Sequence, residues 1–119
     1  MQTILLSIIG CLSFLPVDFP IQLIPSQLEV IEYQKGQVIV NKTLNTSQKF
    51  IAYFEKNKKG WYSSCVSYAP HYVLSSPQIQ INISEEKVIV NYRHEKESYQ
   101  QITKTVDTDE LKKIIEQPQ

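Results

Sequence analysis

The chain has 119 residues, of which 42% are hydrophobic, 10% aromatic and 20% charged, and its formal net charge is zero. This length suits one domain, so we interpret residues 1–119 as a single domain with one hydrophobic core. The hydrophobic content and the balanced charge exclude a disordered chain, and the presence of only 3 glycines excludes a collagen-like repeat.

Residues 1–15 form an apolar segment without a charged side chain. The segment is shorter than the roughly 20 residues that span a bilayer, but it has the length of the apolar part of a signal peptide. Ile8-Ile9-Gly10-Cys11 also resembles the lipobox of bacterial lipoproteins, in which Cys11 would carry the lipid. Against this, no Lys or Arg precedes the run, although signal peptides begin with positive charge. A retained structural segment and a targeting sequence therefore both stay open.

Proline and glycine divide the next part of the chain. Residues 16–27 contain three prolines, which exclude a continuous helix or a central strand, so we expect an extended connector that carries apolar side chains onto the core. Residues 28–33 and 37–41 are rich in β-branched side chains and flank a turn that contains Gly36. This pattern predicts a β-hairpin.

Residues 46–59 carry the strongest helix signal in the chain. Thr46 or Ser47 can cap the first turn, and lysines gather near the end, where the helix dipole favours positive charge. Gly60 follows, as is typical after a helix. The alternation of Phe50, Ala52 and Phe54 also fits a strand, but three independent signals favour the helix.

Strand patterns dominate the second half of the chain. Ile79, Ile81 and Ile83 alternate with polar residues, which places them on one buried face. The predicted strands are residues 61–68, 78–84, 87–93 and 99–106. A short helix over 109–116, capped by Asp107 or Thr108, and a frayed tail over 117–119 complete the chain.

These elements predict an α+β fold. We expect an antiparallel sheet of about four to six strands, with the helix over 46–59 packed on it, a short C-terminal helix and an apolar N-terminal segment.

The sequence offers little catalytic chemistry. Cys65 and His71 are the best candidates for a nucleophile and base, but nothing near Cys65 marks an activated thiol, and a packed side chain explains it equally well. The 2 cysteines and 2 histidines are too scattered for a zinc site. One disulfide between Cys11 and Cys65 stays open if the chain is exported. We therefore predict that the protein is not an enzyme and has no cofactor or metal.

Two surface features point to a protein partner. Residues 35–84 contain six lysines against one acid, a field that can steer an acidic partner. Tyrosine is the commonest aromatic residue, and it clusters with Trp61 between residues 61 and 72. Trp61 also fits a core position. The candidate partner-binding residues are Lys56, Lys58, Lys59, Trp61, Tyr62, Tyr68 and Tyr72.

These features predict a small non-catalytic protein that acts by binding another protein, of the inhibitor or immunity type. A single arginine argues against nucleic-acid binding. A cytoplasmic location fits this function. The alternative is an exported or periplasmic protein, lipid-anchored through Cys11, with a structural role in the cell envelope. Membrane contact is expected only if residues 1–15 act as a signal or anchor.

Overall fold

The structure, a computed structural model, describes residues 15–65 and 68–117. The predicted N-terminal segment therefore lies outside the described residues, apart from Leu15. In chain order, the described elements are β1 (Pro16–Val17), the 3₁₀-helix η1 (Ile21–Leu23), β2 (Gln27–Gln34), β3 (Gln37–Asn45), α2 (Gln48–Lys56), β4 (Trp61–Ser63), β5 (Tyr72–Ser75), β6 (Ile79–Ile83), β7 (Lys87–Tyr92), β8 (Gln100–Thr105) and α3 (Asp109–Glu116).

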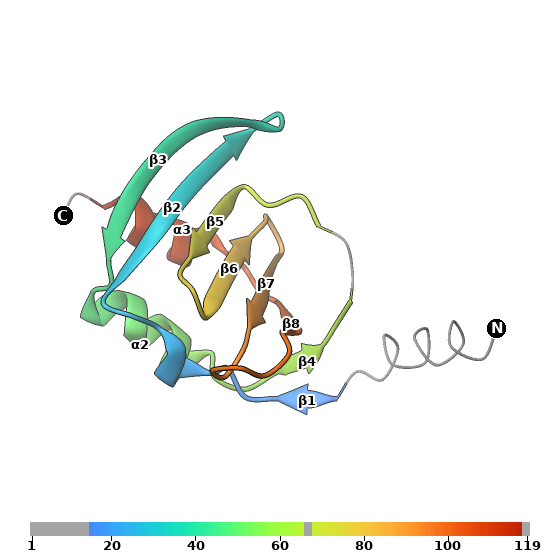
Figure 1. The fold of residues 1–119 in the computed structure, drawn as a ribbon. Coiled ribbons are helices and arrows are strands. Elements are labelled where there is room, and N and C mark those ends of the chain that lie inside the picture. The colour runs from blue at the N-terminus through green and yellow to red at the C-terminus, as the bar shows by residue number, and fades with distance from the viewer. Residues whose placement is uncertain (1–14, 66–67, 118–119) are drawn as a thin grey trace.

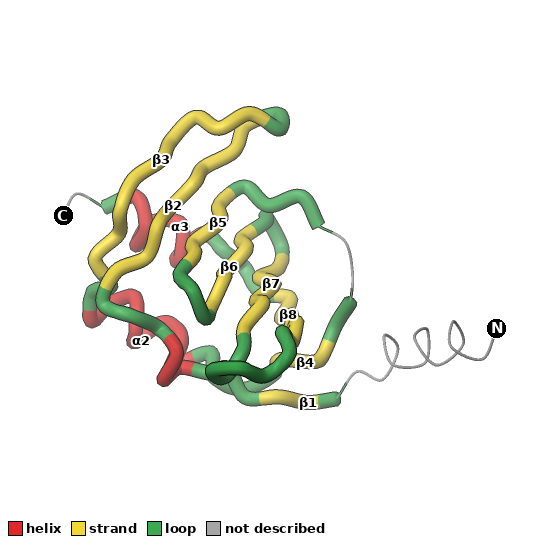
Figure 2. Tube along the Cα trace, in the orientation of Figure 1, coloured by secondary structure: helices red, strands yellow, loops and turns green. Residues whose placement is uncertain are grey.

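The strands form one antiparallel sheet in the order β1-β4-β8-β7-β6-β5-β2-β3 (Figure 1 and Figure 2). The α+β class is confirmed, but the predicted count of four to six strands was too low, because the described residues contain eight. The sequence pattern missed β1 and β5. The strand predicted over 61–68 ends at Ser63, and residues 66–67 lie outside the described part.

A row of aliphatic side chains crosses the four central strands. Leu74, Ile81, Val90 and Ile102 lie opposite one another in β5, β6, β7 and β8, and each is at most 1% exposed. Side chains that lie directly opposite in an antiparallel pair share a face, so this row packs toward the helices. The predicted face of Ile79, Ile81 and Ile83 is confirmed, since all three belong to the core.

The proline-rich connector closes one end of this core, as predicted. Phe19 is 1% exposed, stacks on Phe54 with ring centroids 4.4 Å apart, and lies 5.3 Å from the Trp61 ring. Its backbone N–H donates to Lys58 O at 2.9 Å, which ties the connector to the segment after α2. Aromatic burial of this size contributes several kcal/mol to folding.

Helix α2 begins as its sequence indicates but ends earlier than predicted. The Ser47 side chain accepts a hydrogen bond from Phe50 N at 3.1 Å and caps the first turn. The helix is shorter than the predicted 46–59 and ends at Lys56. The Trp61 indole N–H then donates to Asn57 O at 2.6 Å, and Gly60 adopts the expected positive φ, +86°.

Helix α3 matches the predicted 109–116, and its Leu111 and Ile115 are buried. The buried Thr108 hydroxyl donates to Ser84 O at 2.7 Å and accepts no hydrogen bond from the first turn of the helix, so it anchors the helix to the turn after β6. Asp107 takes part in the cap instead, because its carboxylate accepts from Asp109 N at 3.0 Å. The predicted hairpin is also confirmed, with Lys35 and Gly36 both at positive φ in a two-residue turn.

The two faces of β6 can be told apart by matched substitutions. Ile81→Asp should destabilise the protein by about 4 kcal/mol or more, because it places a charge in the buried row. Gln80→Asp should cost about 1 kcal/mol or less, because Gln80 lies on the opposite face and is half-buried. Chemical denaturation measures both values. Equal losses of stability would contradict the assignment of the two faces.

Candidate binding surface

On the sheet face opposite the helices, the five strands β4–β8 carry one charged side chain, Lys87, which lies at the margin as the first residue of β7. The alternation that buries the aliphatic row turns the intervening residues to this second face. Ile89 shows that the sheet has two distinct faces. Its side chain is only 1% exposed, but it lies outside the core cluster beneath the helices and so points to the second face. We call this surface the uncharged face and define it by Tyr62, Val73, Ser75, Gln80, Asn82, Ile89, Asn91, Gln101 and Thr103. Asn82 and Ile89 are themselves buried, so they support this face from below and the other residues offer its surface.

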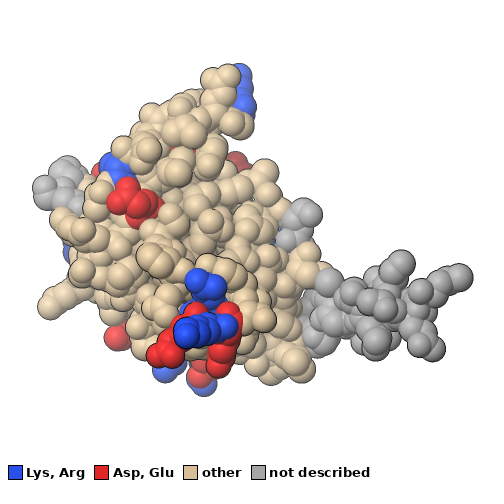
Figure 3. Space-filling view, in the orientation of Figure 1, with Lys and Arg blue, Asp and Glu red and all other residues tan. Residues whose placement is uncertain are grey.

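The absence of charge is visible on the molecular surface. Figure 3 has the orientation of Figure 1, in which α3 lies behind β2 and β5, and the middle of the surface over β5 and β6 shows no charged group. Charged groups gather at the margins, at the hairpin tip and around the turn between β7 and β8. One residue in five is charged in the whole chain, so the neutral centre reflects segregation rather than a shortage of charge.

Tyr68 is held over the uncharged face by amide side chains. Its hydroxyl accepts hydrogen bonds from Asn91 Nδ2 at 2.7 Å and from Asn82 Nδ2 at 3.4 Å. Asn82 is only 3% exposed and also donates to Ile89 O at 3.0 Å. A buried amide needs such partners, so these contacts fix Tyr68 relative to the sheet.

A groove of about 840 Å³ lies where the uncharged face meets the hairpin. Residues 33–36 of the hairpin form one wall, and residues 68–71 form the other. Val73 and Asn82 of the uncharged face belong to its lining, as do Ser84 and Glu85. Tyr33 N donates to His71 O at 2.8 Å, and the His71 ring lies 3.1 Å from the Glu32 carboxylate, so the two walls are joined at one end.

Two of the predicted aromatic contacts are instead part of the core. Trp61 is 1% and Tyr72 is 3% exposed, so neither can contact a partner while the fold is intact. Burial raises the pKa of Tyr72, and the nearby carboxylates of Glu116 and Glu32 raise it further. Tyr62 and Tyr68 do reach the surface, and the structure brings both to the uncharged face, with Tyr62 48% exposed.

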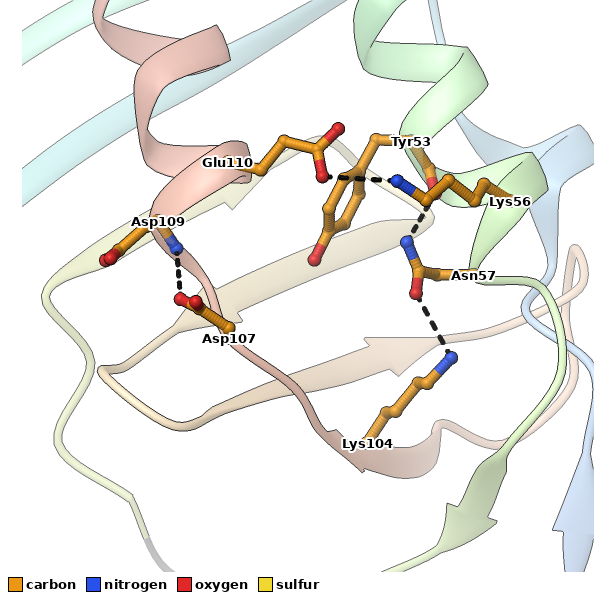
Figure 4. Close-up of polar contacts among 7 residues, drawn as sticks. All are labelled: Tyr53, Lys56, Asn57, Lys104, Asp107, Asp109 and Glu110. Atoms are coloured by element: carbon orange, nitrogen blue, oxygen red, sulfur yellow. Dashed lines mark hydrogen bonds and ion pairs between the residues drawn. The ribbon is translucent and has the colours of Figure 1, made fainter.

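The predicted basic surface is largely neutralised in space. Lys59 pairs with Asp18 at 2.8 Å, and Lys56 pairs with Glu110 of α3 at 3.4 Å (Figure 4). Among the described residues Lys58 has no acidic partner. The structure does not bring these lysines to the uncharged face, because they lie at the end of α2 and just beyond it, on the helix side.

The same region contains one unsatisfied polar group. The Tyr53 ring lies beneath the contact between Lys56 and Glu110 (Figure 4), and its buried hydroxyl has no hydrogen-bond partner among the described residues. Burial raises its pKa, as do the charges of Glu110 and Asp107. The neutral form of Tyr53 is therefore strongly favoured, and its side chain packs between the two helices.

The candidate nucleophile takes a different role. Cys65 is disulfide-bonded, so its sulfur is not available as a thiolate. The other cysteine of the sequence, Cys11, lies outside the described residues. Within residues 15–65 and 68–117, no group of three or more acidic, histidine or cysteine side chains could hold a metal ion.

Neither a family model, nor a curated protein, nor a solved structure matches this chain. Within the described part, neither helix is long and apolar enough to cross a membrane. Sequence reasoning found Tyr62 and Tyr68 but missed the hairpin wall of the groove. No local signal marks that wall, because it becomes part of a site only when β5 pairs with β2.

Removal of the Tyr68 hydroxyl tests whether its hydrogen bonds to Asn82 and Asn91 hold Tyr68 over the uncharged face. Tyr68→Phe leaves two amides without their shared acceptor and should cost about 1–2 kcal/mol of stability. Tyr62→Phe is the matched control, since the exposed Tyr62 hydroxyl makes no hydrogen bond in the described part of the chain, and it should be neutral. Thermal unfolding of both variants measures the difference. A neutral Tyr68→Phe would show that the hydroxyl does not hold this segment.

Proposed function

We propose that this chain is a small non-catalytic binding protein, and that a protein partner covers the uncharged face together with the adjoining groove. The observation that carries the proposal is the segregation of charge. The face offers tyrosine, asparagine, glutamine, serine and threonine side chains on a rigid sheet, and its margins are charged.

This composition matches what buried protein interfaces require. Charged residues are depleted at the centre of interfaces because they are costly to desolvate, and tyrosine is enriched because it combines apolar area with a polar tip. Surfaces rich in Tyr, Ser and Asn bind proteins by combining aromatic contact area with adaptable hydrogen bonds. An inhibitor or immunity role is one use of such a surface, and it remains part of the proposal.

The proposal does not depend on an acidic partner. Lys56 and Lys59 are engaged with acids of the chain itself, so their field at a distance is weak. The groove adds depth to an otherwise flat surface, and its aromatic and imidazole side chains, Tyr33, Tyr68 and His71, can receive a protruding side chain of the partner.

The experiment compares two substitutions of the same kind. Gln80→Asp introduces a charge at the centre of the uncharged face, and Gln48→Asp introduces it at an exposed position at the start of α2. Each variant is used to capture partners from the native source after crosslinking, and the recovered protein is identified and titrated. Gln80→Asp should weaken binding by roughly tenfold or more, because the charge must be desolvated, and Gln48→Asp should not. The proposal would be contradicted if the wild-type protein and both variants bound the partner equally, or if none of the three recovered a partner.

A second proposal concerns the compartment, and the disulfide at Cys65 supports it. Disulfides persist mainly in oxidising compartments, so the bond favours an exported protein over a cytoplasmic one. Intact mass and thiol alkylation of protein from the native source test this directly. Cys65 should resist alkylation until a reductant is added. Alkylation of the folded protein without reductant would contradict export.

A further inference from the structure

The two edges of the sheet differ sharply. At one edge, β1 has only two residues and begins with Pro16, which cannot donate a hydrogen bond to another strand. At the other, β3 has nine residues without proline. Among residues 15–65 and 68–117, no strand pairs with the outer side of β3. Every second residue of this strand therefore directs its N–H and C=O away from β2, which is a template for another strand.

The end of the hairpin has little support of its own. Strand β5 pairs with β2 only over Glu29–Glu32, so the hairpin beyond Glu32 is two-stranded. Val38 is 55% and Ile39 is 49% exposed there. A two-stranded ribbon is at best marginally stable in water, and a third strand would supply hydrogen bonds and cover apolar surface.

The usual protection against strand addition is weak on β3. Charged side chains, especially lysine, commonly guard sheet edges. The only charged residue of β3 is Lys42, and its ammonium donates to Ile115 O at 3.3 Å, which holds the side chain toward the end of α3. The irregularity in the pairing of β2 and β3 lies near Ile39, so the segment from Val40 to Asn45 keeps regular geometry.

We propose that β3 pairs antiparallel with β3 of a second copy of this chain, about a two-fold axis that passes near Asn41. The strand can pair with its own copy without meeting a like charge, because it contains no acid and its one base, Lys42, lies off the axis. With Asn41 opposite its copy, Lys42 lies opposite Val40 and the two lysines avoid each other, whereas a pairing centred on Lys42 brings like charges together. Two asparagine amides can donate to and accept from one another at the axis.

This pairing goes beyond the proposed partner binding and leaves its surface free. Since the axis is perpendicular to the sheet, both uncharged faces lie on the same side of the dimer. A partner with two equivalent sites would then bind with the advantage of two linked contacts.

Sedimentation velocity of the full chain, over a range of concentrations, tests the inference. The wild-type protein should dimerise. Asn41→Lys should weaken the association by roughly tenfold or more at low salt, with partial recovery at high salt, because two added charges meet at the axis. Gln22→Lys, at an exposed position in η1, should leave the association unchanged. A wild-type monomer throughout, or a dimer that Asn41→Lys does not affect, would overturn the inference.

Hydrogen exchange on the wild-type protein gives an independent answer. The amides of Val40–Leu44 that point away from β2 should exchange more slowly as the concentration rises. Equal exchange at all concentrations would show that β3 is not the contact, whether or not the substituted protein folds. Neither measurement involves the partner of the uncharged face, so failure here leaves that proposal standing.

Discussion

The aliphatic row formed by Leu74, Ile81, Val90 and Ile102 determines the rest of the molecule. These four side chains are buried at the same level of the sheet and set the register of the four central strands. A shift of one residue in any strand would turn its aliphatic side chain to the other face, so the energetic cost of a slip is large. Because the row is fixed, the amide and tyrosine side chains of the intervening positions are fixed as well.

The uncharged face is thus a product of core packing. Asn82 shows the coupling, because it lies between Ile81 and Ile83 in the chain and has its side chain nearly as buried as theirs on the opposite face. The Asn82 amide donates hydrogen bonds to the Tyr68 hydroxyl and to Ile89 O of β7. The polar side chains of the second face are therefore held in fixed positions, like the side chains of the core. A rigid polar surface loses little conformational entropy when a partner binds, which favours affinity.

Local patterns in the sequence predicted most of the elements, and pairing over long distances explains what they missed. The alternation of Ile79, Ile81 and Ile83 and the cap at Ser47 are local signals, and both predictions are confirmed. Strand β5 has only four residues and no long alternation, so its place between β2 and β6 follows from the tertiary structure alone. The acids that pair with the basic stretch escaped local patterns for a similar reason, since Asp18 and Glu110 are distant from Lys59 and Lys56 in sequence but neighbours in space.

The hairpin of β2 and β3 contributes to both proposed surfaces, but it does so through different groups, side chains in one and backbone in the other. Side chains at its tip, such as Tyr33, form a wall of the groove, whereas the outer backbone of β3 offers unpaired hydrogen-bonding groups. The first surface would bind a partner through its shape and polar side chains, and the second would pair with β3 of a second copy through backbone hydrogen bonds. A side-chain substitution in the groove therefore need not disturb the β3 edge. The extension of the hairpin beyond β5 exposes the wall of the groove, and the position of β3 at the end of the strand order exposes its outer edge.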